Sequence, residues 1–156
     1  YLSSSEDGRN RLPPYQPAAN WRTEHPIALH SFNHSLHLAY VGAAPKGMIY
    51  LSSSADGRNW TPAQQPNTTW RTEHSVSLQS FNNRLYLGYV GRELKGIICL
   101  ASSEDGKKWT DIYQPNTTWR TDYPISLSSH MERVEKILIE PPSFLRNILL
   151  PKPAKL

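Results

Sequence analysis

The sequence has little of what would indicate a disulfide scaffold or a membrane protein. It holds a single cysteine, Cys99, among its 156 residues, so no disulfide can form within the chain. The longest apolar runs, residues 96–101 and 137–139, are far shorter than the roughly 18 residues that a transmembrane helix needs. We therefore expect no membrane span, and no segment of the sequence indicates a cellular compartment.

Signatures of catalysis and of nucleic-acid binding are also scarce. The sequence contains no glycine-rich phosphate loop and no Ser/His/Asp or Cys/His arrangement. Its 17 Lys and Arg residues outnumber its 13 Asp and Glu residues, for a net charge of +4, but they are spread along the chain. The sequence predicts a protein that is not an enzyme, uses no cofactor and does not bind nucleic acid.

What the sequence does contain is a repeat of 49 residues. Its most similar part, Asn-Thr-Thr-Trp-Arg-Thr-acid, occurs twice, and a diverged copy, Ala-Ala-Asn-Trp-Arg-Thr-Glu, precedes them. The three copies occupy residues 18–24, 67–73 and 116–122. A second marker, Ser-x-Asp-Gly, keeps the same step at residues 5–8, 54–57 and 103–106. A fixed period near 50 residues indicates one supersecondary unit repeated, as in a solenoid or a propeller.

Each repeat is predicted to form four short strands. In the first complete repeat, residues 27–32 and 35–41 form a hairpin about a tight turn at Asn33-His34, and residues 47–54 and 60–64 form the third and fourth strands. The next repeat places its strands at residues 76–81, 84–90, 96–103 and 109–113. Four antiparallel strands in about 40 to 50 residues, without helical periodicity, are typical of a propeller blade. The predicted fold is therefore all-β: a partial β-propeller of four-stranded antiparallel blades over residues 1–129.

Two heptapeptides carry a family resemblance. Ser-Ala-Asp-Gly-Arg-Asn-Trp at 54–60 and Ser-Glu-Asp-Gly-Lys-Lys-Trp at 103–109 resemble the Asp-box turn of sialidase-like propellers, whose pattern has one more residue between Asp and Gly. With the Phe-Asn-x-x-Leu-Tyr-Leu hairpin at 81–87, they are also similar to bacterial repeat propellers that include sugar-binding lectins. The resemblance implies a propeller fold in which the Asp holds a turn. It implies little about function, because such turns occur in enzymes and in binding proteins alike.

The phase of the repeat predicts self-association. Residues 1–16 read as the third and fourth strands of one blade and residues 125–129 as the first strand of another, whereas a propeller needs roughly four to eight blades. We expect a homo-oligomer that completes the ring, with a six-bladed dimer favoured over a trimer or a larger ring; a fragment of a longer repeat protein is the rival interpretation. Residues 130–156 diverge from the repeat and are expected to form a strand or a short helix, followed by a proline-rich extension.

The Trp-Arg-Thr-acid segment is the candidate ligand site. It connects the last strand of one unit to the first strand of the next, where propellers usually present binding loops. Tryptophan can stack on a sugar ring, and arginine and carboxylate side chains can bind hydroxyl groups. The candidate residues are Trp21, Arg22, Glu24, Trp70, Arg71, Glu73, Trp119, Arg120 and Asp122. A second interpretation stays open, in which the tryptophan wedges between blades and the arginine pairs with the acid.

Three histidines form a candidate metal set, which we interpret as structural. His30 and His37 face each other across the predicted hairpin, and His34 lies in its turn. Their counterparts one repeat later are not a comparable set of ligands: Gln79, Tyr86 and Asn83. We therefore expect a polar cross-strand pair and no metal.

The sequence thus favours one function over another of a different class. The favoured function is a non-enzymatic, self-assembling propeller that binds a small polar ligand, preferably a carbohydrate, at the Trp-Arg-Thr-acid loops. The alternative is a structural or protein-interaction propeller without a ligand. Cys99, which stands where Tyr50 stands one repeat earlier, is expected to be buried filler and not a nucleophile.

Overall fold

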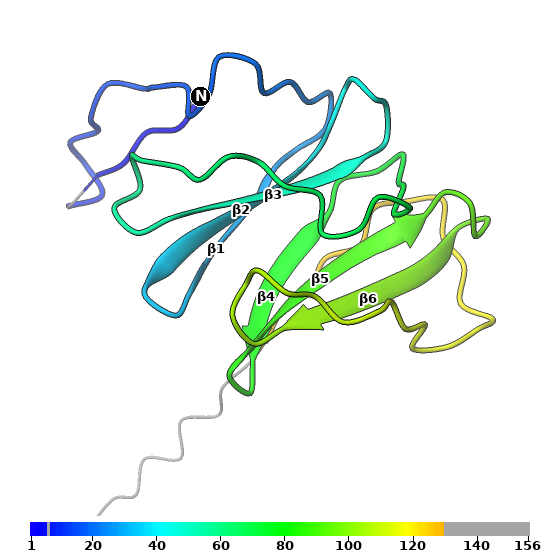
Figure 1. The fold of residues 1–156 in the computed structure, drawn as a ribbon. Coiled ribbons are helices and arrows are strands. Elements are labelled where there is room, and N and C mark those ends of the chain that lie inside the picture. Colours follow the sequence, from blue (N-terminus) through cyan, green and yellow to red (C-terminus); the bar gives the residue numbers. More distant parts are fainter. Residues whose placement is uncertain (6, 130–156) are drawn as a thin grey trace, which may run out of the picture.

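The computed structural model describes residues 1–5 and 7–129, and this part of the chain forms two three-stranded antiparallel sheets and no helix (Figure 1). The first sheet contains β1 (Ala28–Phe32), β2 (Ser35–Val41) and β3 (Ile49–Ser54). The second contains β4 (Ser77–Phe81), β5 (Arg84–Gly91) and β6 (Ile97–Ser103). The all-β prediction is confirmed. The predictions for residues 130–156 lie outside the described residues.

Each sheet begins with a hairpin closed by a two-residue turn. Asn33 and His34 have φ of 47° and 59°, and Asn82 and Asn83 have φ of 48° and 57°. Two consecutive residues with positive φ are what a type I′ turn requires, and asparagine tolerates this region better than most residues. The turn fixes the register, so His30 pairs with His37 across the hairpin as predicted.

The predicted fourth strands are not formed as strands. Residues 60–64 contact β3 at two points only, through backbone hydrogen bonds of Thr61 with Ser53 and of Gln64 with Leu51. At the first point the Thr61 hydroxyl accepts the Ser53 N–H at 3.0 Å, and the Thr61 carbonyl accepts the Ser52 hydroxyl at 2.7 Å. A side-chain oxygen therefore takes the place of a backbone acceptor, which interrupts the ladder.

The second repeat has the same interruption beside β6. The Thr110 hydroxyl accepts the Ser102 N–H at 3.1 Å, and Tyr113 forms the single bridge, with Leu100. The N-terminal segment has the corresponding bridge between Leu2 and Tyr15. These segments therefore extend each sheet by isolated contacts instead of by a fourth strand.

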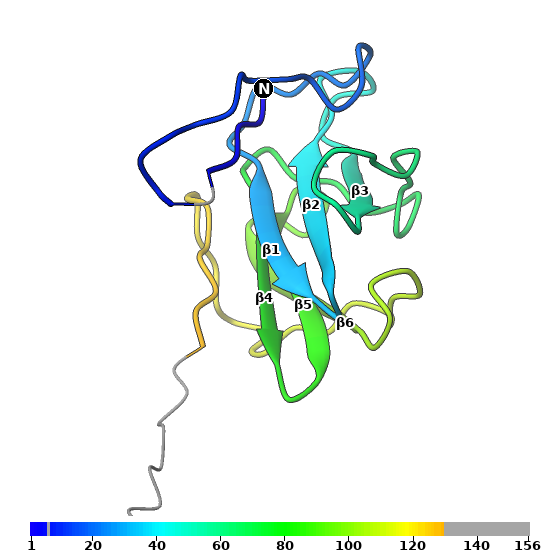
Figure 2. The same cartoon turned by 90° about the vertical axis from the view of Figure 1, so that its left-hand side faces the viewer.

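The core lies between the two sheets, and β2, β5 and β6 are the most buried strands. Leu85, Leu87 and Tyr89 of β5 are almost completely buried, and Cys99 of β6 is buried beside them, as predicted. The first strands of the two sheets lie side by side, with β1 next to β4 (Figure 2). Burial of this apolar surface is the main stabilising contribution available to a chain with so little regular structure.

Side chains link the first segments of successive units in one repeated pattern. Nε2 of His30 lies 2.9 Å from the Ser80 hydroxyl, and Gln79, 49 residues after His30, donates from Nε2 to the Ser129 hydroxyl at 2.6 Å. Residues 125–129 were predicted to be a strand, but they form no strand beside β4: the Leu127 backbone N–H donates to the Ser77 hydroxyl at 2.9 Å. Parts of all three segments line one cavity of about 500 Å³.

Candidate functional site

The three Trp-Arg-Thr-acid segments, here called the linkers, are built into the fold by backbone hydrogen bonds. In the second linker the Thr72 N–H donates to the Gly47 carbonyl of the β2–β3 loop at 3.0 Å, and the Arg71 carbonyl accepts the Arg92 N–H of the β5–β6 loop at 2.9 Å. The third linker repeats the first of these bonds, from Thr121 to the Gly96 carbonyl at 3.0 Å. The backbone of the second linker therefore joins both sheets.

Glycine is required at the two positions where the second and third linkers approach the backbone of a preceding loop. Gly47 has φ of +83°, and a Cβ at this position would lie 2.9 Å from the Thr72 carbonyl oxygen. Gly96 has φ of +81°, and a Cβ there would lie 2.9 Å from the carbonyl oxygen of Thr121. Both the conformation and the close approach of the linker exclude a side chain.

The three linker tryptophans lie in three different environments. Trp70 is only 4% exposed and stacks on Tyr89 of β5, with ring centroids 5.8 Å apart. Trp21 is half-buried and stacks on Tyr40 of β2 at 5.5 Å. Trp119 is 56% exposed. The faces of Trp70 are thus covered by protein, whereas Trp21 and Trp119 have surface available to a ligand.

Two of the three linker arginines bind their own loops through the side chain. Nη1 of Arg22 donates to the Ala19 carbonyl at 2.7 Å, and Nη1 of Arg71 donates to the Thr68 carbonyl at the same distance. The Arg120 backbone bridges to Ile97. These bonds leave the other guanidinium nitrogens of Arg22, which is exposed, free to bind an acceptor, since a guanidinium has five N–H donors.

The linker acids differ in their partners. Glu73 forms an ion pair with Nε of Arg92, at 3.2 Å. The acid therefore pairs with the arginine that follows β5 and not with Arg71. Within residues 1–5 and 7–129, Glu24 and Asp122 form no ion pair, and both are exposed. The position equivalent to Arg92 in the first sheet is Ala43, which explains why Glu24 has no such partner.

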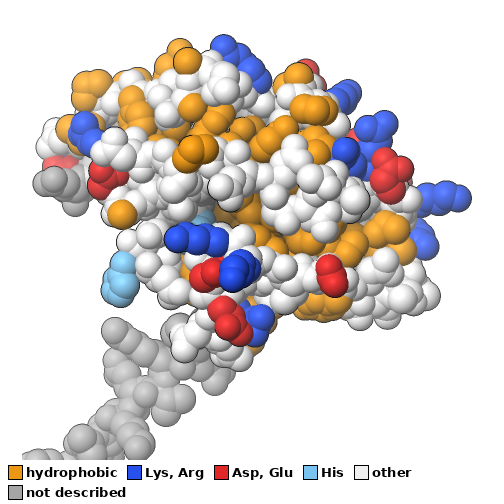
Figure 3. Space-filling view, in the orientation of Figure 1, with side chains coloured by type: hydrophobic (Ala, Val, Ile, Leu, Met, Phe, Trp, Pro, Cys, Tyr) orange, Lys and Arg blue, Asp and Glu red, His pale blue; other side chains and the backbone are white. Residues whose placement is uncertain are grey.

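A cavity of about 470 Å³ opens beside Trp21. Its walls are aromatic, because Tyr40 stacks on Trp21 and on Tyr50, the latter at 5.3 Å, and Trp60 contributes to the lining together with Arg22. A second cavity, of about 370 Å³, also lies against Trp21, Arg22 and Tyr40. Figure 3 shows apolar side chains on the surface over the first sheet and the N-terminal segment. Aromatic walls with a few polar groups are the usual composition of a small-molecule site.

The corresponding place in the second sheet is filled. Cys99 replaces Tyr50, and its Sγ and the Leu94 side chain both approach Gly91, since a Cβ built on Gly91 would lie 3.1 Å and 3.2 Å from them. Tyr89, the counterpart of Tyr40, is 1% exposed. The same backbone therefore carries an aromatic cavity in one sheet and a closed core in the other.

Burial raises the pKa of a tyrosine in each sheet and of the Cys99 thiol. Burial, with the neighbouring Tyr50, raises the pKa of Tyr40 to about 12, and burial raises the pKa of Tyr89 further. Burial also raises the pKa of the Cys99 thiol, which makes it a poor nucleophile. At neutral pH the tyrosine hydroxyls are therefore hydrogen-bonding groups and not charges.

The Asp-Gly turns hold themselves together. The Asp56 carboxylate accepts the backbone N–H groups of Arg58 and Asn59 at 2.8 Å and 2.7 Å, and Asp105 accepts those of Lys107 and Lys108, both at 2.8 Å. These backbone bonds lower the pKa of Asp105 to about 2 and that of Asp56 further. The carboxylates are thus used as turn-forming acceptors.

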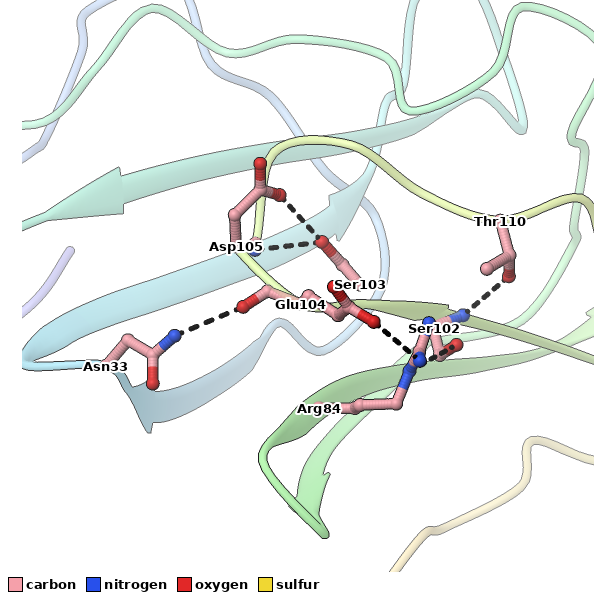
Figure 4. A network of polar contacts seen from close by, with 8 residues as sticks. Asn33, Arg84, Ser102, Ser103, Glu104, Asp105 and Thr110 are labelled. Atoms are coloured by element: carbon pink, nitrogen blue, oxygen red, sulfur yellow. Dashed lines mark hydrogen bonds and ion pairs between the residues drawn. The ribbon is translucent and has the colours of Figure 1, made fainter.

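The Asp-Gly turn at residues 103–106 also contacts the first sheet. Figure 4 shows Asp105 with Ser103, and shows Asn33 of the β1–β2 turn donating to the Glu104 carbonyl, at 3.2 Å. The Glu104 side chain forms an ion pair with Arg84 at 2.8 Å. The turn therefore joins the two sheets at the end away from the linkers.

The three histidines have separate surroundings, and His34 is exposed in its turn. His37 is 5% exposed and lies against Gly106, where a Cβ would meet its ring at 2.2 Å, and burial lowers its pKa. His30 is bound to Ser80. No group of three or more potential metal ligands occurs in the part of the chain that the structure describes.

Tyr40, Tyr50 and Trp60, which form much of the wall beside Trp21, were missed by the sequence-based interpretation. The sequence gives little indication of this wall, because the pairing of Tyr40 with Tyr50 becomes apparent only when the register of β2 and β3 is known.

Comparisons with protein-family models, curated proteins and solved structures found no match to this chain. Among the described residues, none lies in a helix with the length and apolar character needed to cross a bilayer.

Proposed function

We propose that this protein is a non-enzymatic, self-associating β-propeller that binds carbohydrate, and that its principal binding site is the aromatic cavity beside Trp21. One observation carries the proposal: the half-exposed Trp21, stacked on Tyr40, borders cavities that also hold the exposed guanidinium of Arg22. A sugar ring packs an apolar face on an indole while its hydroxyls bind nearby donors and acceptors. Arg22 supplies donors, whereas Glu24 is exposed in the same linker and lines neither cavity.

The other linkers have lesser roles in this proposal. Trp119, Arg120 and Asp122 offer a second, more open surface, because Trp119 is 56% exposed. Trp70, Arg71 and Glu73 form the weakest site, because the indole is covered and the acid is already paired. Weak sites repeated around a ring gain avidity when a multivalent glycan binds them together.

The propeller itself is part of the proposal. It is supported by the 49-residue spacing between equivalent strands, since β1 begins at Ala28 and β4 at Ser77, and by the cavity that the first segments of three units line together. In a propeller the first strands of the blades surround a common axis. Each blade would then consist of three strands and a loosely joined fourth segment.

Self-association is supported by apolar side chains exposed at both ends of the described chain. Tyr1 and Leu12 are exposed in the N-terminal segment, and Trp119 and Tyr123 near residue 129. In a closed ring of chains these surfaces face each other, and a dimer of three blade equivalents per chain is the smallest such ring. Sedimentation equilibrium of the full chain tests this, because a folded monomer at micromolar concentration contradicts it.

The binding proposal is tested by a glycan array with two matched variants. Trp21→Ala should abolish binding while the protein stays folded, and Trp119→Ala should weaken binding to a multivalent glycan only. If no sugar binds, or if binding survives in Trp21→Ala, the site beside Trp21 is wrong.

A second function is favoured by a specific observation. The Trp70 ring is covered by Tyr89, Thr72 is fully buried, and the backbone between them joins both sheets. These features fit a linker whose task is to hold units together in a protein-interaction scaffold. This function is preferred if the glycan array is negative and Trp70→Ala disrupts assembly.

A further inference from the structure

Two equivalent tryptophans differ in the partner of the indole nitrogen. Trp60 follows the second Asp-Gly turn, and its Nε1–H donates to the Tyr15 hydroxyl at 2.8 Å. That hydroxyl in turn donates to the carbonyl of Gly57. The phenol of the preceding unit therefore completes a short chain of hydrogen bonds beside Trp60, and Tyr15 forms part of the wall of a cavity of about 470 Å³ there.

Trp109 stands 49 residues after Trp60, and its donor has no such partner. Its Nε1 is buried and finds no hydrogen-bond acceptor among residues 1–5 and 7–129. The residue in the place of Tyr15 is Gln64, which has the same backbone bridge to its neighbour, Leu51, that Tyr15 has to Leu2. The Gln64 side chain forms no hydrogen bond with the described residues, and it is too short to fill the space of a phenol.

A cavity of about 360 Å³ lies beside Trp109, with Gln64 in its wall where Tyr15 stands in the equivalent cavity beside Trp60. Gln64, Gly106 and Trp109 line it, together with Ser52 and Thr61 of the first unit. Gly106 is the counterpart of Gly57, so the carbonyl that accepts the phenol hydroxyl in the first pair has its equivalent here. A buried donor without an acceptor costs free energy, and a ligand that supplies the acceptor recovers it.

We propose that the cavity beside Trp109 binds a small phenolic compound, whose hydroxyl accepts from Nε1 of Trp109 and donates to the Gly106 carbonyl, as the Tyr15 hydroxyl does beside Trp60 and Gly57. The ligand needs a group that both donates and accepts, which a phenol supplies and a carboxylate does not. Its ring occupies the space that the Tyr15 ring occupies in the preceding pair. This site is separate from the sugar site beside Trp21 and does not depend on it.

Titration with p-cresol, which is the tyrosine side chain as a free molecule, tests the proposal. The indole N–H groups of the five tryptophans give separate signals in a ¹H–¹⁵N spectrum of the labelled full chain. p-Cresol should shift the Trp109 signal, assigned by its loss in Trp109→Phe. Toluene, which has the same ring and no hydroxyl, should bind roughly three- to tenfold more weakly, the value of one hydrogen bond. Equal binding of the two compounds, or no shift of the Trp109 signal, overturns the proposal.

Exchanging the residues at positions 15 and 64 provides matched controls. Gln64→Tyr should supply a phenol hydroxyl from the chain itself to Nε1 of Trp109, so the Trp109 signal should move towards that of a hydrogen-bonded indole and cease to respond to p-cresol. This variant also identifies the Trp109 signal without Trp109→Phe. Tyr15→Gln should create a second p-cresol site, seen at the Trp60 signal. A Trp109 signal that still responds to p-cresol in Gln64→Tyr overturns the proposal, as does one that responds to glucose in place of p-cresol.

Discussion

The two sheets have the same strand order and equivalent turns, yet they use their central aromatic residues differently. In the first sheet Tyr40 lies between Trp21 and Tyr50 and borders an open cavity. In the second sheet Tyr89 is covered by Trp70 and packs near Cys99. The difference shows that the backbone of the repeat fixes where an aromatic ring stands, whereas residues on neighbouring strands decide whether the ring is core or surface.

Removing the two stacked indoles should give the largest effect and the clearest contrast. Trp70→Ala should lower the free energy of unfolding by about 3 to 5 kcal/mol, the usual cost of emptying a buried aromatic site. Trp21→Ala should cost roughly half as much, because its ring is already partly exposed. Urea unfolding followed by circular dichroism measures both. Equal losses would mean that the two linkers are packed alike, against the structure.

Exchanging the residue types at the equivalent positions 50 and 99 should make the packing of each sheet more like that of the other. Cys99→Tyr places a large ring in a closed core and should cost about 1 to 3 kcal/mol through overpacking. Tyr50→Cys removes one ring of the open stack and should cost about 0.5 to 1.5 kcal/mol. Thermal unfolding of both variants distinguishes them. If Cys99→Tyr were neutral, the second sheet would hold a hidden cavity and the contrast would fail.

The glycines under the linkers should respond alike in both sheets, since this part of the fold is shared. Gly47→Ala and Gly96→Ala should each cost about 2 kcal/mol, from positive φ and from contact with a carbonyl oxygen. Gly57→Ala is the control, because its φ of +71° is similar and its neighbour is a movable Leu36 methyl at 3.3 Å. It should cost about 1 kcal/mol. A control as damaging as Gly47→Ala would show that the linker contact is unimportant.

The smallest effect is expected at the Asp-Gly turns, as a dependence on acid. The pKa of Asp56 lies below its ordinary 3.8 because the Asn59 and Arg58 N–H groups bind the charged form. A lowered pKa in the folded state stabilises the fold above about pH 4 and ceases to do so as the pH falls through the folded value. The urea midpoint should therefore drop between pH 5 and pH 2, approximately, and Asp56→Asn should drop less than the native chain. An identical drop in both proteins would assign the acid sensitivity to other groups.

The hairpins could be predicted from the sequence because their signals are local. Asn33-His34 and Asn82-Asn83 adopt the positive φ that short hairpin turns need, and they stand between alternating apolar stretches. Cys99 was also predicted as buried filler from its position in the repeat, and the structure confirms its burial.

The fourth strands and the states of the linker tryptophans could not be predicted in this way. The ladder beside β3 ends because the Thr61 hydroxyl binds a backbone N–H, a competition that the pattern of apolar residues does not reveal. Trp21 and Trp70 occupy identical motifs, but their exposure depends on strand residues tens of positions away. Whether the exposed linkers bind sugar stays a prediction, since packing and binding use the same residue types.

The linker backbone also has a consequence for the order in which the molecule opens. Thr72 bonds to the first sheet and its neighbour Arg71 to the second, so neither sheet can separate from the other without breaking bonds at this one linker. Stability in such arrays is carried by coupling between nearest neighbours. The Thr72 and Arg92 amide protons should therefore exchange with solvent in a single cooperative step, and the N-terminal segment, which has one bridge between Leu2 and Tyr15, should open earlier. Together with the core between the sheets, the linker should therefore make two units that share no strand unfold as one cooperative unit.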